Sequence, residues 1–165
     1  MAVYLFTFHA YRSWLPDHPR GYVRRHQGIL PPDAQMSEHY VRRARFDAVR
    51  FTPAMAQLII ECTQQACLQY DWRCHCITVV WSHVHILLSW RGFRAFDSVR
   101  TMLKRELGRG LRQRFTDNPT QPFFSRGSSR RRISDRRHFD HLMKTYLPAH
   151  RKYHGICWSE TQSGQ

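Results

Sequence analysis

The chain has 165 residues, 42% of them hydrophobic, which supports one domain with its own core and gives no basis for two. Its 26 Lys and Arg residues against 12 Asp and Glu residues give a formal net charge of +14, so nucleic acid is the leading partner class. The sequence has no signal pattern, no apolar run of ~18 residues and an odd number of cysteines, so we expect a cytoplasmic protein with reduced thiols, nucleoid-associated in a bacterium.

The first predicted element is a strand over residues 3–9, because this segment is rich in β-branched and aromatic residues. Residues 10–50 then contain scattered prolines and glycines and predict a loop-rich insertion or lid. Aromatic residues alternate there with arginines, which suits base stacking and phosphate contacts, although a surface insertion explains this composition equally well. These residues are Tyr11, Trp14, Tyr22 and Tyr40, with Arg12, Arg20, Arg24, Arg25, Arg42 and Arg43.

A helix is predicted from Thr52-Pro53 to about Tyr70-Asp71, since proline suits a first helical turn and apolar residues recur on one face. That face comprises Met55, Leu58, Ile59, Cys62, Ala66 and Leu68. Two strands follow, over about 72–80 and 83–90, with Ser82 as the polar break between them. No clear turn signal separates the two strands.

The first of these strands contains Cys74-His75-Cys76, which has the composition of a zinc-binding fragment. Alternation along a strand would place both thiols on one face, and no second Cys/His pair follows at zinc-knuckle spacing. We therefore interpret these cysteines as small buried residues.

A basic amphipathic helix is predicted from Ala95 to about Phe115. Its apolar residues recur at three- and four-residue steps and are Phe96, Val99, Met102, Leu103, Leu107 and Leu111. Basic residues, including Lys104 and Arg105, occupy the remaining positions. They predict either a nucleic-acid contact or an ordinary solvated face.

Beyond Asp117-Asn118-Pro119, residues 122–125 suggest a short edge strand, and residues 127–137 are rich in arginine. Guanidinium groups suit phosphate oxygens, so we predict a phosphate-contacting loop. Its arginines are Arg130, Arg131, Arg132, Arg136 and Arg137. The order of predicted elements favours an α+β domain with helices packed on an antiparallel sheet.

Two histidines, His83 and His85, flank Val84 in the second of the paired strands, so their imidazoles are expected on one face as half of a metal site. With 11 histidines in the chain, such a triplet is expected roughly 0.3 times by chance. Tyr146 and His150 are four residues apart, and on a helix they would share a face and supply a nucleophile and a third ligand.

Two further features bear on that helix. Pro148 lies between Tyr146 and His150 and is expected to kink the helix or start a new turn. Tyr22 and His26 have the same spacing, but they lie in the Pro/Gly-rich stretch, where a shared helical face is not expected.

The segment His83-Val84-His85-Ile86-Leu87-Leu88, followed by Tyr146-Leu147-Pro148-Ala149-His150-Arg151, resembles the single-tyrosine HUH (His-hydrophobe-His) transposases, which include the REP-associated tyrosine transposases. Residues 6–8, 14–17, 125–127 and 134–135 extend this resemblance over nearly the whole chain. The chain departs from the family in having Trp81-Ser82 where Met-Pro-Asn or Met-Pro-Asp is common, so that Ser82 alone remains to orient a ligand.

The resemblance implies a ferredoxin-like (RRM-like) HUH endonuclease fold, with residues 1–165 as one transposase-like domain. It implies that His83, His85 and His150 hold Mg or Mn, although three imidazoles would equally suit Zn, Co or Ni. His150 stands where family members often have Gln or Asn. Tyr146 would be the nucleophile that nicks single-stranded DNA beside a hairpin and forms a 5′-phosphotyrosine link.

The residues expected to contact DNA are the basic ones of these segments: Lys104, Arg105, Arg130, Arg131, Arg132, Arg136, Arg137, Lys144 and Arg151. Family members include monomers and homodimers, and in a homodimer Tyr146 would serve the histidine pair of its partner. Two other hypotheses remain open. One is a domesticated, catalytically silent DNA-hairpin-binding protein or regulator, and the other is an RNA-binding module.

Overall fold

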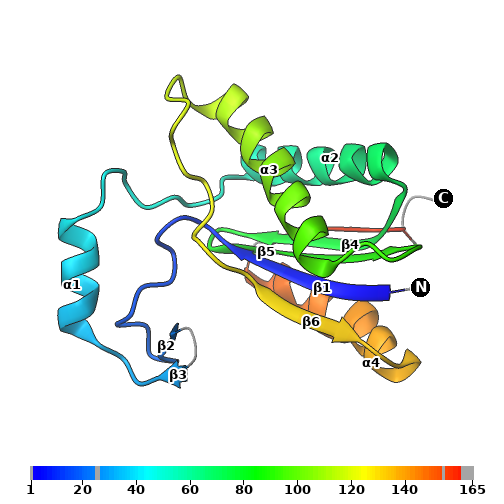
Figure 1. Cartoon of the computed structure of the whole chain (residues 1–165), viewed down its shortest axis with the longest axis horizontal. Coiled ribbons are helices and arrows are strands. Elements are labelled where there is room, and N and C mark those ends of the chain that lie inside the picture. The colour runs from blue at the N-terminus through cyan, green and yellow to red at the C-terminus, as the bar shows by residue number, and fades with distance from the viewer. Residues whose placement is uncertain (1, 25–26, 154, 161–165) are drawn as a thin grey trace.

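The computed structural model describes residues 2–24, 27–153 and 155–160. Within them, a five-stranded antiparallel sheet has the strand order β6-β1-β5-β4-β7. Two long helices, α2 and α3, cover one face of this sheet, and the helix that begins with α4 covers the other (Figure 1). The sheet strands are β1 (Ala2–His9), β4 (Trp72–Val80), β5 (His83–Trp90), β6 (Ser129–Ile133) and β7 (Ile156–Ser159), and these helices are α2 (Pro53–Tyr70), α3 (Phe96–Phe115) and α4 (Arg136–His141).

The elements with the strongest periodicity lie where the sequence predicts them. The Thr52 hydroxyl accepts a hydrogen bond from the Met55 N–H and caps α2, which ends at Asp71 in a left-handed conformation. Strands β4 and β5 are joined by the two-residue turn at 81–82. Leu68 was expected on the apolar face of α2 but is 78% exposed, so that expectation is wrong.

Between the strong elements, one prediction is refined and another needs correction. The insertion at residues 10–50 contains regular structure: β2 (Tyr22–Arg24) pairs with β3 (Gly28–Leu30), and α1 (Ala34–Arg42) follows. Figure 1 shows these elements beside the sheet, away from α2 and α3. The strand next to β1 at the edge of the sheet is β6, inside the arginine-rich segment that was expected to be a loop, whereas residues 122–125 form only an isolated bridge from Phe124 to Ala10.

Alternation along β1 divides the interior into two cores. Phe6 and Phe8 face α2 and α3 in the first core. Leu5 faces the opposite side, where the second core consists of Leu5, Cys76, Leu87, Ile133, Leu142 and Leu147. Ile133 explains why residues 129–133 pair with β1, because this pairing buries its side chain in the second core.

Strand β4 contains a bulge that changes the interpretation of its cysteines. Cys74 lies opposite Leu88 and Cys76 opposite Leu87, so one extra residue is inserted between them. Cys74 therefore packs in the first core and Cys76 in the second. Both are buried as expected, but the prediction that they share one face is wrong.

The helix that begins with α4 continues through Pro148 with a change of helix type. Asp135 caps it by accepting a hydrogen bond from the His138 N–H at 2.7 Å. A π turn (Leu142–Tyr146), α5 (Leu147–Ala149) and a 3₁₀ turn (His150–Tyr153) follow. The Leu147 N–H bonds to the Leu142 carbonyl, and both leucine side chains are buried in the second core.

Among the described residues, no helix combines the length and the apolar character needed to cross a membrane.

Candidate metal and nucleophile site

Three histidines meet on the face of the sheet that carries the second core. His83 and His85 project from β5, and His150 reaches them from the 3₁₀ turn after α5. Their ligand nitrogens all lie within 4.8 Å of one another. The structure thus brings together the three residues that the sequence proposed as metal ligands.

Each imidazole of this triad is held through Nδ1. The nitrogen lies 2.9 Å from the Ser82 hydroxyl in His83 and 2.8 Å from the Thr7 hydroxyl in His85. In His150, Nδ1 lies 2.9 Å from the carbonyl oxygen of Tyr146, which can only accept, so the ring proton is on Nδ1. Nε2 is therefore the nitrogen that each ring can offer to a cation.

The second nitrogen of His85 supports a bound ion. Its Nε2 is buried and has no hydrogen-bond partner among the described residues. Buried polar atoms are normally paired, so an orphaned nitrogen beside two further imidazoles fits a missing ligand such as a metal ion. The side chains of His83, His85 and His150 therefore suit a divalent metal ion.

Burial keeps the two strand histidines neutral. It lowers the pKa of His83 to about 4, with smaller contributions from His9 and His150. It lowers the pKa of His85 to about 2, with smaller contributions from the neighbouring histidines. Neutral imidazoles have the lone pairs that metal coordination requires at neutral pH.

Tyr146 lies beside this triad. Its ring centroid is 5.5 Å from that of His85 and 5.0 Å from that of His150, and the residue is 38% exposed. The 3₁₀ turn explains how Tyr146 can expose its phenol and also hold His150 through its backbone carbonyl. The backbone N–H of His150 bonds to the Leu147 carbonyl, which leaves the Tyr146 carbonyl for the imidazole. The phenol is therefore accessible while the Tyr146 backbone helps to orient His150, a candidate metal ligand.

The triad and Tyr146 line a cavity of about 790 Å³, which includes residues that the sequence did not single out as site residues. His9 lies opposite His83 in the pairing of β1 with β5, and burial lowers its pKa. Thr7 is opposite His85 in the same way. Alternation along β1 puts both residues on one face, but only the pairing register shows that this is the site face. The other newly found lining residues include Ser13, His18 and Ser129.

The predicted DNA-contacting residues are spread over several surfaces. Pairing of β6 with β1 sets Arg131 opposite Leu5 on the site face and Arg132 opposite Tyr4 on the α2/α3 face. The backbone of Arg130 belongs to β6, while its side chain lies outside the described residues. Arg25 of the insertion also lies outside them.

The remaining predicted contacts lie on helices. Lys104 donates to the carbonyls of Ser125 and Gly127, and burial lowers its pKa to about 8, so this ammonium group joins α3 to the following loop. Arg105 pairs with Glu106. Four predicted contacts are exposed on or near the C-terminal helix: Arg136, Arg137, Lys144 and Arg151. Of these, Arg136 and Lys144 are paired to Asp140.

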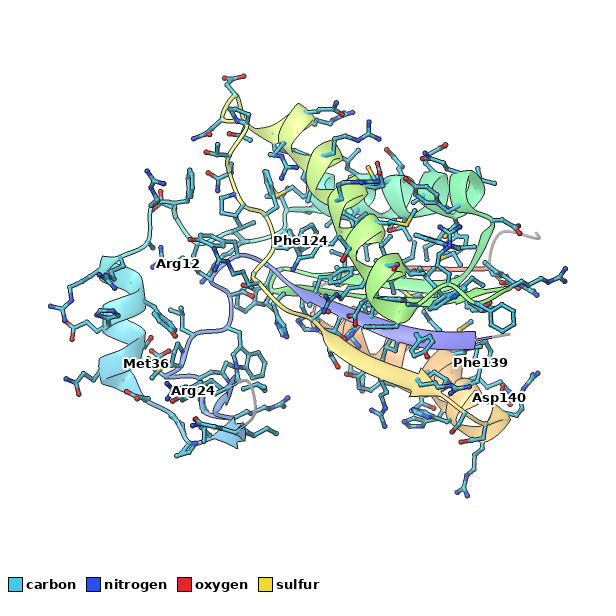
Figure 2. The ribbon with its side chains drawn as sticks, viewed as in Figure 1. Arg12, Arg24, Met36, Phe124, Phe139 and Asp140 are labelled. Atoms are coloured by element: carbon cyan, nitrogen blue, oxygen red, sulfur yellow. The ribbon has the colours of Figure 1, made fainter. Side chains whose placement is uncertain are left out.

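Figure 2 shows where the labelled side chains lie in the fold. Arg12 and Phe124 lie where the insertion meets the sheet, whereas Met36 and Arg24 belong to the part that extends from it. Phe139 and Asp140 lie on α4, at the opposite end of the molecule from α1.

No protein-family model and no curated protein matches the sequence. Among solved structures, a REP-associated tyrosine transposase bound to a REP hairpin matches with a TM-score of 0.56 and 10% sequence identity. The match covers 93% of this chain and 68% of that chain. The two chains share a fold. This relation supports the expected α+β class and, at the level of fold, the expected likeness to REP-associated tyrosine transposases.

Proposed function

We propose that the protein is a metal-dependent single-strand DNA nickase and strand-transferase, a transposase of the HUH type, with Tyr146 as its nucleophile. The observation that carries the proposal is the convergence of three imidazoles, each held at Nδ1, beside a partly exposed tyrosine in one cavity. The net charge of +14 suits a polyanionic substrate.

The proposal includes a ferredoxin-like classification of residues 1–165 as one transposase-like domain. The element order β1-α2-β4-β5-α3-β6 and the strand order β6-β1-β5-β4 are those of a βαββαβ unit, to which β7 adds an edge strand. The fold relation to a hairpin-bound transposase supports hairpin-flanked DNA as the substrate and a location on the nucleoid.

In the proposed reaction, the Tyr146 oxygen attacks the phosphorus of a backbone phosphodiester. A bond forms between this oxygen and phosphorus, the bond from phosphorus to the 3′ oxygen breaks, and the phenolic proton ends on the departing 3′-OH. The 5′-phosphotyrosine link conserves the energy of the original ester. A different 3′-OH can then displace Tyr146, so strand transfer needs no nucleotide cofactor.

His83, His85 and His150 would hold a divalent cation in this reaction. When bound, the cation polarises the scissile phosphate and stabilises the charge that develops on it. Family precedent favours Mg or Mn, and an all-imidazole donor set suits Zn, Co or Ni as well. Calorimetric titration of the protein with each of these metals shows which of them the site prefers.

The decisive experiment uses a labelled single-stranded hairpin DNA with Mg or Mn, followed by a denaturing gel. We expect a covalent protein–DNA adduct with the unaltered protein and none with Tyr146→Phe, which keeps the ring but lacks the attacking oxygen. Native gels should show unchanged DNA binding. Tyr40→Phe is the matched control, because Tyr40 is 52% exposed and lies outside the cavity. Full-rate nicking by Tyr146→Phe would exclude the mechanism.

A catalytically silent DNA-hairpin-binding protein is the second candidate. One observation favours it: Nδ1 of His83 is held by the Ser82 hydroxyl, which orients a ligand less strongly than a carboxylate. This candidate predicts salt-sensitive hairpin binding without an adduct under any metal. Competition between RNA and single-stranded DNA of one sequence tests the RNA-binding hypothesis, and dimerisation stays a prediction that sedimentation can check.

A further inference from the structure

The cavity continues beyond the triad to a wall formed by the insertion. Trp14, His18 and Arg20 line this part. The rings of Trp14 and His18 are stacked, with centroids 3.7 Å apart and planes inclined by 15°. Trp14 also contacts the ring of His9, which lies next to His83. A continuous series of rings therefore connects the triad to the insertion.

This wall is fixed relative to the triad by hydrogen bonds to one carbonyl. The Ser13 hydroxyl and the Ala10 N–H both donate to the carbonyl of Ser82, at 2.7 and 2.8 Å. Ser82 directly precedes His83, so the start of the insertion is attached to the turn that presents the first ligand. The wall is thus part of the same site.

The turn that carries His18 is also fixed. The Trp14 indole N–H donates to the Gly21 carbonyl at 2.9 Å. Gly21 has a φ of +74°, and a Cβ there would lie 2.0 Å from the Leu30 carbonyl oxygen, so only glycine fits. The stacked pair therefore rests on a constrained loop that the β2–β3 hairpin supports.

The polar groups of the wall suit a nucleotide. Nδ1 of His18 accepts the Arg20 backbone N–H at 3.1 Å, which leaves Nε2 as the ring nitrogen that can donate to a ligand. The Arg20 residue is exposed and brings a guanidinium group, which suits phosphate oxygens or the acceptor edge of a base. Stacked rings with adjacent donors are typical of sites for single-stranded nucleic acid.

We propose that Trp14, His18 and Arg20 form a subsite for one nucleotide that flanks the scissile phosphate. The base stacks on the His18–Trp14 pair, and Arg20 contacts the neighbouring phosphate. The cavity of about 790 Å³ lies within the ~300–1,000 Å³ typical of ligand pockets, so it has room for a nucleotide beside a phosphate at the triad. This inference rests on the proposed function for the identity of the strand.

The test measures binding without cleavage, in the Tyr146→Phe background with a chelator, by fluorescence anisotropy. The probes are thymidine and adenosine single-stranded 10-mers and a 10-mer of abasic deoxyribose phosphates. We expect His18→Ala to weaken binding of the base-containing probes about tenfold, the factor of one stacked base, and to leave abasic binding unchanged. His18→Phe should restore most of this loss. Arg20→Ala should weaken binding of all the probes.

His39→Ala is the matched control, since His39 is an exposed histidine of α1 in the same insertion, outside the cavity. Thermal unfolding of each variant shows whether the fold is retained. Equal effects of His18→Ala on the base-containing and abasic probes, or no effect on either, would overturn the subsite while leaving the proposed function intact. Absence of binding to every probe by the parent protein would instead overturn the proposed function.

Discussion

At the scale of single residues, the triad is oriented by three different partners: a turn hydroxyl, a strand hydroxyl and a backbone carbonyl. Ser82 holds His83, Thr7 holds His85, and the carbonyl of Tyr146 holds His150. Through this carbonyl, the proposed nucleophile Tyr146 helps to orient the proposed metal ligand His150. We therefore expect metal affinity and the position of the phenol to be linked through a single peptide group.

The lowered pKa values of His83 and His85 predict that the metal-free protein loses stability in acid. Both folded-state pKa values lie below the ordinary 6.5, so the unfolded chain binds protons first as the pH falls. The stabilisation is complete above pH 6.5. From there down to about pH 4, each of the two histidines lowers the free energy of unfolding by about 1.4 kcal/mol per pH unit.

Urea unfolding at several pH values in the presence of a chelator measures this dependence. We expect His85→Gln, which has no titratable group at this position, to show a shallower decline than the unaltered protein. His39→Ala, at an exposed position, should keep the original slope. Identical slopes in all three proteins would contradict the assignment.

At the scale of elements, the C-terminal helix carries both Tyr146 and His150, and two buried leucines of the second core anchor it. Leu147 is fully buried, so Leu147→Ala should lower the free energy of unfolding by ~2–5 kcal/mol. It should also weaken metal binding, because His150 follows on the same helix. Urea unfolding and calorimetric metal titration measure the two effects.

Leu68→Ala is the control for this prediction, since Leu68 is 78% exposed on α2 and its loss should change stability by less than ~0.5 kcal/mol. A Leu147→Ala protein with unaltered stability and metal affinity would show that the helix is held in some other way.

Periodicity was sufficient to predict α2 and α3, and continuous apolar runs predicted the paired strands β4 and β5, which are buried on both faces. Periodicity failed for β6, because its three consecutive arginines show no alternation and Ile133 is, of its described side chains, the one in the second core. It failed at Cys76 because a bulge is a tertiary feature that reverses the alternation. Pairing of Tyr146 with His150 followed from their spacing, whereas Thr7 and His9 needed the register of β1 against β5.

At the scale of the whole molecule, the charge of +14 predicts strongly salt-dependent DNA binding. Each phosphate contact with single-stranded DNA contributes about −0.7 to the slope of log K against log salt concentration. Arg131 lies on the site face and Arg132 on the opposite face of the same strand, so they form a matched pair. Arg131→Ala should make the slope less negative by about 0.7, and Arg132→Ala should leave it unchanged.

Anisotropy titrations of a single-stranded 10-mer measure these slopes. The salt concentration should range from about 50 to about 200 mM, where the affinity for DNA changes strongly with salt. Equal slope changes for the two variants would show that the single-stranded DNA does not bind preferentially along the site face of the sheet.

The π turn in the C-terminal helix makes the geometry of the site hard to lose without losing the fold. It contains one residue more than an α turn, and this surplus lets Leu142 and Leu147 both reach the second core. Insertion of one further residue between Leu142 and Tyr146 would rotate everything downstream by about 100°, turning Leu147 toward solvent and Tyr146 away from the histidines. Selection for a folded chain alone would therefore preserve the orientation of Tyr146, whether or not this residue acts as a nucleophile.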